Sequence, residues 1–150
     1  MSLINRISSF LLIIAMFLLV LGEAMATVTE TTDKINFGLG PKVLVDISNK
    51  LPNGTSFTFH CKSKNDDLGT HVVEPGQKYG FRFRVNFFGT TLFFCGAKWQ
   101  GGHVVFDIYK ASRDDMYRCP YHCRWEARGD AIVGYMEHYP NPDIVIPWNK

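Results

Sequence analysis

The stretch YGFRFRV at residues 79–85 decides the fold, because it alternates strictly between large apolar residues and residues that water tolerates. Successive side chains of a β-strand point to opposite faces, so the three aromatic residues and Val85 form one apolar face. Gly80, Arg82 and Arg84 form the other face, which stays in water. This alternation predicts an antiparallel strand with one buried and one solvated face.

The same two-residue period recurs on both sides of this stretch, with turn residues between the segments. Thr91–Trp99 is apolar on both faces, which predicts a central strand, whereas the proline-containing tail Tyr139–Lys150 is expected to be an extended cover. Further strands are predicted at Lys42–Asn49, Ser56–Cys61, His71–Val73, His103–Tyr109, Cys123–Glu126 and Ala131–Tyr135. After residue 26, no segment has the apolar period of a helix. The chain is therefore predicted to be all-β, with a single domain built as a small antiparallel β-sandwich.

The N-terminus has the order of a secretory signal peptide. Arg6 precedes an unbroken apolar run of 12 residues, Phe10–Leu21, and small residues follow before the predicted cut. This run is shorter than the ~20 residues that span a bilayer, so a cleaved leader is favoured over a retained membrane anchor. We therefore predict a signal peptide at 1–26, a flexible arm at 27–41 and the β-domain at 42–150, in a protein that is secreted to the extracellular space.

The charge of the chain sets few demands on its partners. The formal net charge is only +2, and it does not change when residues 1–26 are removed. Such a weak charge does not require nucleic acid or an anionic membrane as a partner. We expect no nucleic-acid partner and no stable membrane insertion after the signal peptide is removed.

All four cysteines lie after the predicted leader, at Cys61, Cys95, Cys119 and Cys123. An even number of cysteines in a small secreted domain predicts two disulfides, and three pairings are open. The alternative is a zinc site at Cys119 and Cys123 with the nearby His122. No second closely spaced cysteine pair completes such a site, so we expect no metal and no cofactor.

Asn53-Gly54-Thr55 is a sequence for N-linked glycosylation without proline in the middle. It lies in a segment with turn chemistry, because Asn-Gly tolerates a positive φ. Asn53 is therefore a glycosylation candidate, and the alternative is an unmodified turn residue.

Two groups of residues invite a catalytic interpretation. His60 follows Phe57-Thr58-Phe59, and the first histidine motif of secreted plant-type ribonucleases also follows an aromatic–Thr–apolar strand. The Gly-Leu-Trp-Pro run and the Lys-His-Gly set of those enzymes are missing here. A half-exposed strand position is the better interpretation of His60. Asp66 and Asp67 lack the regular oxygen spacing of a calcium loop, so a solvated turn is favoured. We therefore predict that the protein is not an enzyme.

Arg82 and Arg84 could form a basic surface strip with Lys62, Lys64 and Lys78. An ordinary solvent-facing strand is the simpler interpretation. The strip nevertheless leaves open a defence or membrane-active protein, which would use these cations and exposed aromatic residues.

Several motifs resemble those of the plant self-incompatibility protein family, also called S-protein homologues. The most specific is His60-Cys61-Lys62-Ser63-Lys64-Asn65-Asp66-Asp67-Leu68-Gly69. Further matching segments are Val45–Leu51, Tyr79–Phe83, Thr91–Cys95, Phe106–Tyr109 and Cys119–Trp125. The resemblance implies a secreted, β-rich, disulfide-linked protein without catalytic residues. It implies a ligand for a cell-surface receptor in cell–cell recognition or signalling, like the stigmatic determinants that trigger rejection of self pollen.

In ligand-type members of that family, recognition depends on variable loops and on charged loop residues. The loop candidates in this chain are Lys62–Gly69, Phe87–Thr90, Gln100–Gly102 and Lys110–Arg118. Loops on a rigid sheet are where recognition usually occurs. The residues expected to contact the receptor are Lys64, Asp66, Asp67, Arg113, Asp114 and Asp115.

Overall fold

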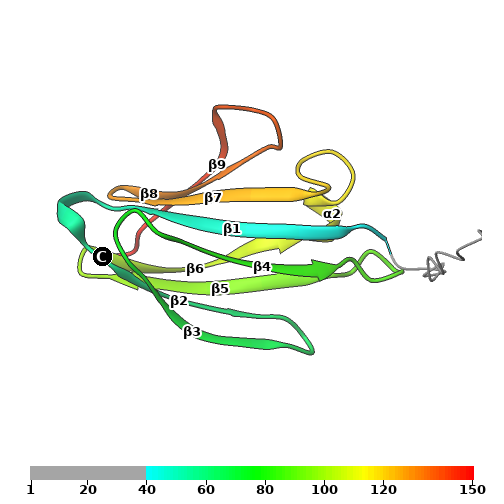
Figure 1. Cartoon of the computed structure of the whole chain (residues 1–150), viewed down its shortest axis with the longest axis horizontal. Helices are drawn as coiled ribbons and strands as arrows, with labels where there is room; N and C mark the ends of the chain where they lie inside the picture. The colour runs from blue at the N-terminus through cyan, green and yellow to red at the C-terminus, as the bar shows by residue number, and fades with distance from the viewer. Residues whose placement is uncertain (1–39) are drawn as a thin grey trace, which may run out of the picture. The chain divides into compact units, whose positions relative to one another are not determined.

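The computed structural model describes residues 40–150, which form two β-sheets packed face to face (Figure 1). The predicted signal peptide and nearly all of the predicted arm lie outside the described residues. The five-stranded sheet has the order β4-β1-β7-β8-β9, and the four-stranded sheet has the order β3-β2-β5-β6. The strands are β1 (Lys42–Lys50), β2 (Phe57–Lys62), β3 (Asp67–Val73), β4 (Lys78–Arg84), β5 (Leu92–Trp99), β6 (Gly102–Lys110), β7 (His122–Arg128), β8 (Ala131–Tyr135) and β9 (Pro142–Pro147). The predicted all-β sandwich is confirmed.

One strand pair departs from the predicted antiparallel pattern. β1 pairs with β7 in parallel, with Val45 opposite Cys123 and Ile47 opposite Trp125, whereas every other strand pair of the described chain is antiparallel. A parallel pair needs a long connection between its strands. Here strands β2 to β6 form that connection, since they lie between β1 and β7 in the chain.

The structure corrects two boundaries of the sequence prediction. β3 begins at Asp67, inside the segment expected to be a loop, and the tail contributes strand β9 at the edge of the sheet. β9 has a proline at each end, and prolines are tolerated at strand ends and on edge strands because the missing N–H costs no ladder bond there. Two short helical turns complete the chain, η1 (Pro52–Gly54) and α2 (Ala111–Asp114).

The core is built by the alternation that the sequence predicted. Val43, Val45 and Ile47 of β1 are completely buried, and the aromatic residues of β4 pack against the same core. The ring of Phe83 lies 4.6 Å from that of Phe93 on β5, so aromatic contacts cross from one sheet to the other. Burying such a side chain contributes about 1.5–3 kcal/mol. The thick aromatic core gives the sheets a rigid base for the connections between them.

Both predicted disulfides are present. Cys61–Cys95 joins directly opposed residues of β2 and β5, and Cys119–Cys123 closes a short loop before β7. The first bridge ties two strands within the four-stranded sheet, and the second fixes the chain where it enters the five-stranded sheet.

Candidate recognition surface

Three connections between strands lie at the end of the sandwich that carries α2, away from the C-terminus (Figure 1). They are the β2–β3 connection (63–66), the β4–β5 connection (85–91) and the β6–β7 connection (111–121), and we call this region the loop end. All six predicted partner contacts lie on or beside these connections. Lys64, Asp66 and Asp67 belong to the first connection and the start of β3, and Arg113, Asp114 and Asp115 belong to the third.

Ser63 organises the β2–β3 connection. Its hydroxyl accepts hydrogen bonds from the main-chain N–H of Asp66 at 3.0 Å and of Asn65 at 3.3 Å. The main-chain N–H of Ser63 donates in turn to the carbonyl of Asp66 at 2.8 Å. A serine that bridges a turn in this way fixes the backbone. Lys64 and Asp66 are exposed on this turn and are accessible to a partner.

The carboxylate of Asp67 is engaged within the protein. Its Oδ1 lies 2.5 Å from Nε2 of His60 and accepts the N–H of Gly69 at 3.0 Å, while Nζ of Lys62 lies 2.9 Å from Oδ2. These contacts, that with His60 first, hold the pKa of Asp67 well below its usual range. His60 occupies a half-exposed strand position, as the sequence analysis favoured. A partner of Asp67 would therefore meet a carboxylate that is already bonded to His60 and Lys62.

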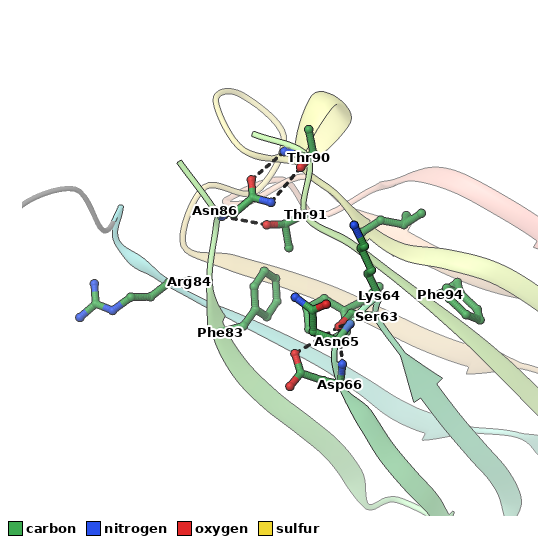
Figure 2. Close-up of a pocket in the computed structure, with 12 residues that line it drawn as sticks. Ser63, Lys64, Asn65, Asp66, Phe83, Arg84, Asn86, Thr90, Thr91 and Phe94 are labelled. Atoms are coloured by element: carbon green, nitrogen blue, oxygen red, sulfur yellow. Dashed lines mark hydrogen bonds between the residues drawn. The ribbon is translucent and has the colours of Figure 1, made fainter. Parts of the chain in front are cut away.

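The β2–β3 and β4–β5 connections border a pocket of about 440 Å³ (Figure 2). Lys64 and Asp66 line it from one connection, and Arg84 lines it from the end of β4. Phe83 and Phe94 contribute apolar surface between these charges. An apolar lining with a few polar groups at its border is the usual composition of a binding site.

Asn86 fixes the β4–β5 connection beside this pocket. Its Oδ1 accepts the N–H of Thr90 and its Nδ2 donates to Oγ1 of Thr90, both at 2.8 Å (Figure 2). The main-chain N–H of Asn86 donates to Oγ1 of Thr91 at 2.9 Å. These bonds fix the conformation of the turn. At its tip, Phe87 is 79% exposed and Phe88 is 83% exposed.

The sequence analysis named this turn as a loop candidate but did not single out its two phenylalanines. Adjacent phenylalanines between Asn86 and Gly89 are unusual in a turn, and this was the signal that could have identified them. Met116, Tyr117 and Tyr121 are also strongly exposed at the loop end. Large apolar side chains held in water are typical of interaction sites.

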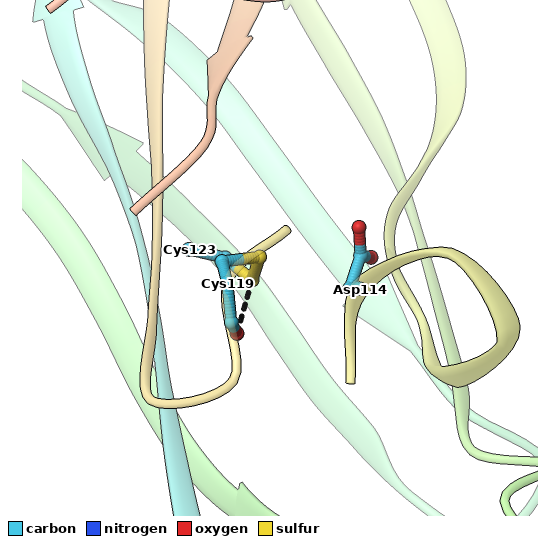
Figure 3. A group of neighbouring side chains, drawn as sticks. All are labelled: Asp114, Cys119 and Cys123. Atoms are coloured by element: carbon cyan, nitrogen blue, oxygen red, sulfur yellow. Dashed lines mark hydrogen bonds between the residues drawn. A yellow bond between two sulfur atoms is a disulfide. The ribbon is translucent and has the colours of Figure 1, made fainter. Parts of the chain in front are cut away.

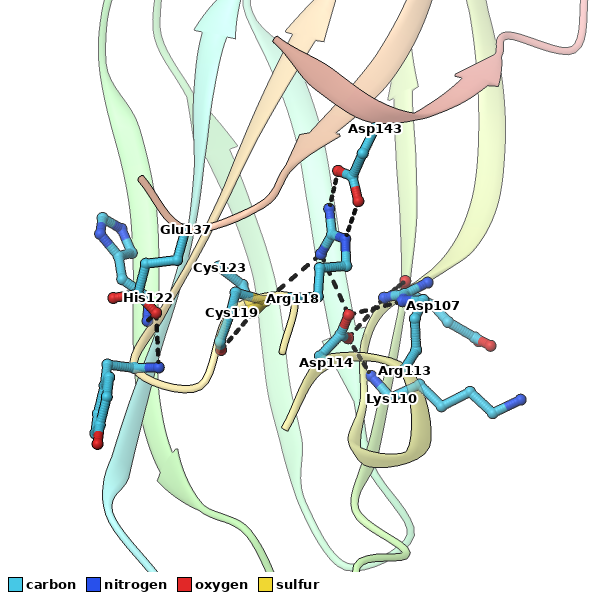
Figure 4. Close-up of a disulfide and its surroundings, with 11 residues drawn as sticks. Asp107, Lys110, Arg113, Asp114, Arg118, Cys119, His122, Cys123, Glu137 and Asp143 are labelled. Carbon is cyan, nitrogen blue, oxygen red and sulfur yellow. Dashed lines mark hydrogen bonds and ion pairs between the residues drawn. A yellow bond between two sulfur atoms is a disulfide. The ribbon is translucent and has the colours of Figure 1, made fainter. Parts of the chain in front are cut away.

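The structure does not expose Asp114, which the sequence analysis expected to contact a partner. The residue is completely buried, because its carboxylate binds groups of its own chain (Figure 4). Oδ2 accepts the main-chain N–H of Lys110 at 2.7 Å, and the guanidinium of Arg113 binds both carboxylate oxygens at 2.8 Å. Arg113 is therefore half-buried beside it, and Asp115 is also only partly exposed. Lys110–Arg118 was expected to be a recognition loop, but two of its cations, Arg113 and Arg118, bind its buried carboxylate Asp114.

Arg118 connects this buried carboxylate to the far edge of the five-stranded sheet. Its Nη1 lies 3.2 Å from Asp114, while Nε and Nη2 bind the two oxygens of Asp143 at 2.7 and 2.9 Å (Figure 4). Its guanidinium also lies over the ring of Trp125, 5.2 Å from the centroid. The sequence analysis missed Arg118, because only the fold brings Asp143, which is distant in the chain, to it.

A carboxylate oxygen of Asp114 and the Sγ atoms of Cys119 and Cys123 lie within 4.8 Å of one another (Figure 3). The two sulfur atoms are joined in a disulfide and offer no thiolate to a metal. His122, the further ligand considered for zinc, directs Nε2 to Asp46 at 2.9 Å instead. These residues therefore do not fit a zinc ion.

Asn53 lies on η1 at the opposite end of the sandwich from the loop end. It is exposed and has a positive φ of 59°, in agreement with the expected Asn-Gly turn chemistry. A glycan at this position would project away from the loop end.

The fold and the loop end define a class of protein: a small, disulfide-linked β-sandwich that displays charged and aromatic connections at one end. Residues 44–148 match the family described as "Plant self-incompatibility protein S1". The chain is 40% identical to S-protein homolog 24 of Arabidopsis thaliana, over 95% of this chain and 91% of that protein. It is 37% identical to self-incompatibility protein S1 of Papaver rhoeas, over 68% of this chain and 74% of that protein. The chain belongs to the plant self-incompatibility protein family.

A solved structure has the same fold. It is described as "Structure of SPH (Self-Incompatibility Protein Homologue) proteins, a widespread family of small, highly stable, secreted proteins from plants". It matches with a TM-score of 0.59 and 20% identity, and the match covers 74% of this chain and 97% of that one. The predicted extracellular location is confirmed, whereas the cleavage position after residue 26 stays a prediction. In the described part of the chain, no helix is long and apolar enough to cross a membrane.

Proposed function

We propose that this secreted protein is a ligand in cell–cell recognition or signalling, and that it binds a cell-surface receptor protein through its loop end. The observation that carries the proposal is the pair Phe87 and Phe88, which are exposed in the β4–β5 connection; this connection borders the same pocket as the charged turn of Lys64 and Asp66. Aromatic anchors bordered by polar residues are the usual composition of a protein interface.

The rigidity of the loop end favours this role. Asn86 and Ser63 fix two of the three connections by side-chain hydrogen bonds, and the buried carboxylate of Asp114 fixes the third. A surface that is already ordered loses less conformational entropy when it binds. The proposal assigns no catalytic residue, since His60 is paired with Asp67, which also binds Lys62, rather than with a second histidine.

The test is saturable binding of fluorescently labelled protein to cells of the source plant, with unlabelled protein as competitor. The double changes Lys64→Ala with Asp66→Ala, and Phe87→Ser with Phe88→Ser, should each weaken binding about tenfold or more. Matched controls lie away from the loop end: Glu74→Ala with Lys98→Ala, and Val105→Ser. Unfolding measurements on every variant separate lost binding from lost folding. Wild-type binding by both loop-end variants would refute the proposal.

A membrane-active defence protein is the alternative, and the same phenylalanines favour it because Arg84 and Lys64 lie nearby. Aromatic residues and cations together can attach a protein to an anionic bilayer surface. Release of dye from vesicles that contain phosphatidylserine distinguishes the two functions. A receptor ligand should leave the vesicles intact at concentrations that saturate its cells. A secreted ribonuclease-like hydrolase is the third possibility, and incubation of the purified protein with RNA tests it directly.

A further inference from the structure

The outer face of the five-stranded sheet carries most of the protein's uncompensated positive charge. Along β4, β1 and β7, alternate residues point away from the core, and their cross-strand register places them on one face. This set, which we call the cationic face, contains seven cations: Lys42, Lys50, Lys78, Arg82, Arg84, Arg124 and Arg128. It contains only two carboxylates, Asp46 and Glu126. The whole chain has a formal net charge of only +2, so its charge is strongly polarised.

The two carboxylates are already engaged within the sheet. Asp46 is 4% exposed, with Nε2 of His122 at 2.9 Å and Nζ of Lys78 at 3.5 Å from Oδ2. Glu126 accepts hydrogen bonds from Arg128 at 2.7 Å and from the hydroxyl of Tyr135 at 2.6 Å. Although burial opposes ionisation, these bonds lower the pKa of Glu126. Both carboxylates are therefore bonded within the sheet, and neither is free to bind the remaining cations.

The remaining arginines are available to an external anion. Arg82 is exposed in the middle of β4, and Arg84 at the end of the strand donates to the carbonyl of Gly40 at 2.7 Å. The guanidinium of Arg124 stacks on the ring of Tyr135, 4.1 Å from the centroid. Stacking orients a guanidinium while its N–H groups stay available at the edge. Part of the cationic face is therefore ordered before any partner arrives.

β4 is the terminal strand of its sheet, and within residues 40–150 no strand pairs with its outer edge. An edge strand presents unpaired main-chain donors and acceptors to solvent. Residues 78, 80, 82 and 84 are the alternate positions of this edge strand on its outer face, and three of them are cations: Lys78, Arg82 and Arg84. Outward residues of a strand repeat every ~6.8 Å, and the same repeat separates alternate side chains of an extended peptide.

We propose that the β4 edge and the cationic face bind an extended, acid-rich protein segment, which adds to the sheet beside β4 with carboxylates at alternate positions. Main-chain pairing would supply affinity, and bidentate pairs between carboxylates and Arg82 or Arg84 would supply specificity. A peptide fits better than a glycan or a lipid, because only a peptide has main-chain groups that match a strand edge. Moreover, none of the exposed large hydrophobic residues of the described chain belongs to β4, β1 or β7, so this face has no group to insert into a bilayer. The surface differs from the loop end except at Arg84, which also lines the pocket there.

The test uses fluorescence anisotropy with a labelled peptide of alternating Glu and Thr, about nine residues long, and the full mature protein. Binding should weaken as salt rises, because exposed charge pairs are screened. A peptide with Gln in place of Glu should bind at least about tenfold more weakly, and so should the acidic peptide with alternate N-methylated residues. The first change removes the charges, and the second removes the main-chain donors.

The variant Arg82→Gln with Arg84→Gln should bind the acidic peptide about tenfold more weakly than the wild type. The matched control is Lys98→Gln with Lys110→Gln, two exposed lysines of the four-stranded sheet, which should stay within about twofold. A thermal melt of each variant confirms folding. In an independent test, the charge-reversed variant Arg82→Glu with Arg84→Glu should bind a peptide of alternating Lys and Thr.

Three results would overturn the proposal. If no acidic peptide binds, the cations of β4 serve only to keep the edge from self-pairing. Equal losses in the control variant would mean that binding reflects net charge alone. If a polyuronate or phosphatidylserine vesicles bind with the same dependence on Arg82 and the peptide does not, the partner is not a protein segment.

Discussion

Nη1 of Arg118 lies 3.2 Å from Oδ1 of Asp114, and both side chains are buried, with 6% and 0% exposed. Both residues belong to the β6–β7 connection, and Arg118 also binds Asp143, at the start of β9. Charges so far from water persist only where each has a partner. The contact therefore explains why a segment with the composition of a surface loop is part of the protein's interior.

Asp114→Ala should destabilise the protein by about 3–5 kcal/mol, because it leaves Arg113 and Arg118 without their shared carboxylate. Urea unfolding followed by tryptophan fluorescence measures the loss. Asp115→Ala is the neighbouring control and should cost much less, since that residue is partly exposed. If Asp114→Ala kept full stability and lost only cell binding, Asp114 would be a receptor contact after all.

The two disulfides should contribute unequally to stability. Cys61–Cys95 closes a loop of 34 residues, whereas Cys119–Cys123 spans 4. The entropy of loop closure predicts losses of about 4 kcal/mol for Cys61→Ala with Cys95→Ala and about 2 kcal/mol for Cys119→Ala with Cys123→Ala. Chemical denaturation without reductant gives the comparison, and a peptide map of the unreduced protein checks the pairing. A larger loss for the short bridge would indicate that contacts around Cys119 outweigh chain entropy.

The pKa of Asp67 is lowered in the folded protein by His60, Gly69 and Lys62. Its ordinary value in the unfolded chain is about 3.9. A carboxyl whose pKa falls on folding stabilises the protein above that value, and the stabilisation is lost as the pH falls through and below it. Unfolding curves between neutral pH and pH 2 should therefore show a shallower acid-side decline for Asp67→Asn than for the wild type. Asp66→Asn is the control, and an identical decline in all three proteins would contradict the assignment.

Asn53 should carry an N-linked glycan when the protein passes through a plant secretory pathway. Thr55→Ala should remove the resulting mass increment, and Thr55→Ser, which keeps the acceptor sequence, should retain it. Both changes leave Asn53 itself in place, where its positive φ of 59° makes other residues strained. Treatment with a glycosidase followed by mass spectrometry provides the reading. Equal masses for wild type and Thr55→Ala would show that the site is unused.

The strand alternation in the sequence was sufficient to predict the inner and outer faces. At 79–85 and in Lys42–Asn49, each side chain's place follows from its neighbours, because a strand has a period of two. The cysteines likewise indicated two bridges. Their pairing stayed open, because it depends on β2 lying beside β5, which no local pattern encodes.

The sequence by itself determined the β-sandwich, the inner and outer faces of its strands and most of its turns, since these depend on local alternation and turn chemistry; it did not determine the start of β3 or strand β9. Only the tertiary structure decided the parallel pairing of β1 with β7 and which charges are available to a partner. Asp114 and Lys64 are both charged residues of polar segments, yet the first is buried against Arg118 and the second faces solvent. The physical reason is that Arg118, four residues from Asp114, is itself held by Asp143 at the start of β9, and only folding brings that distant carboxylate beside it.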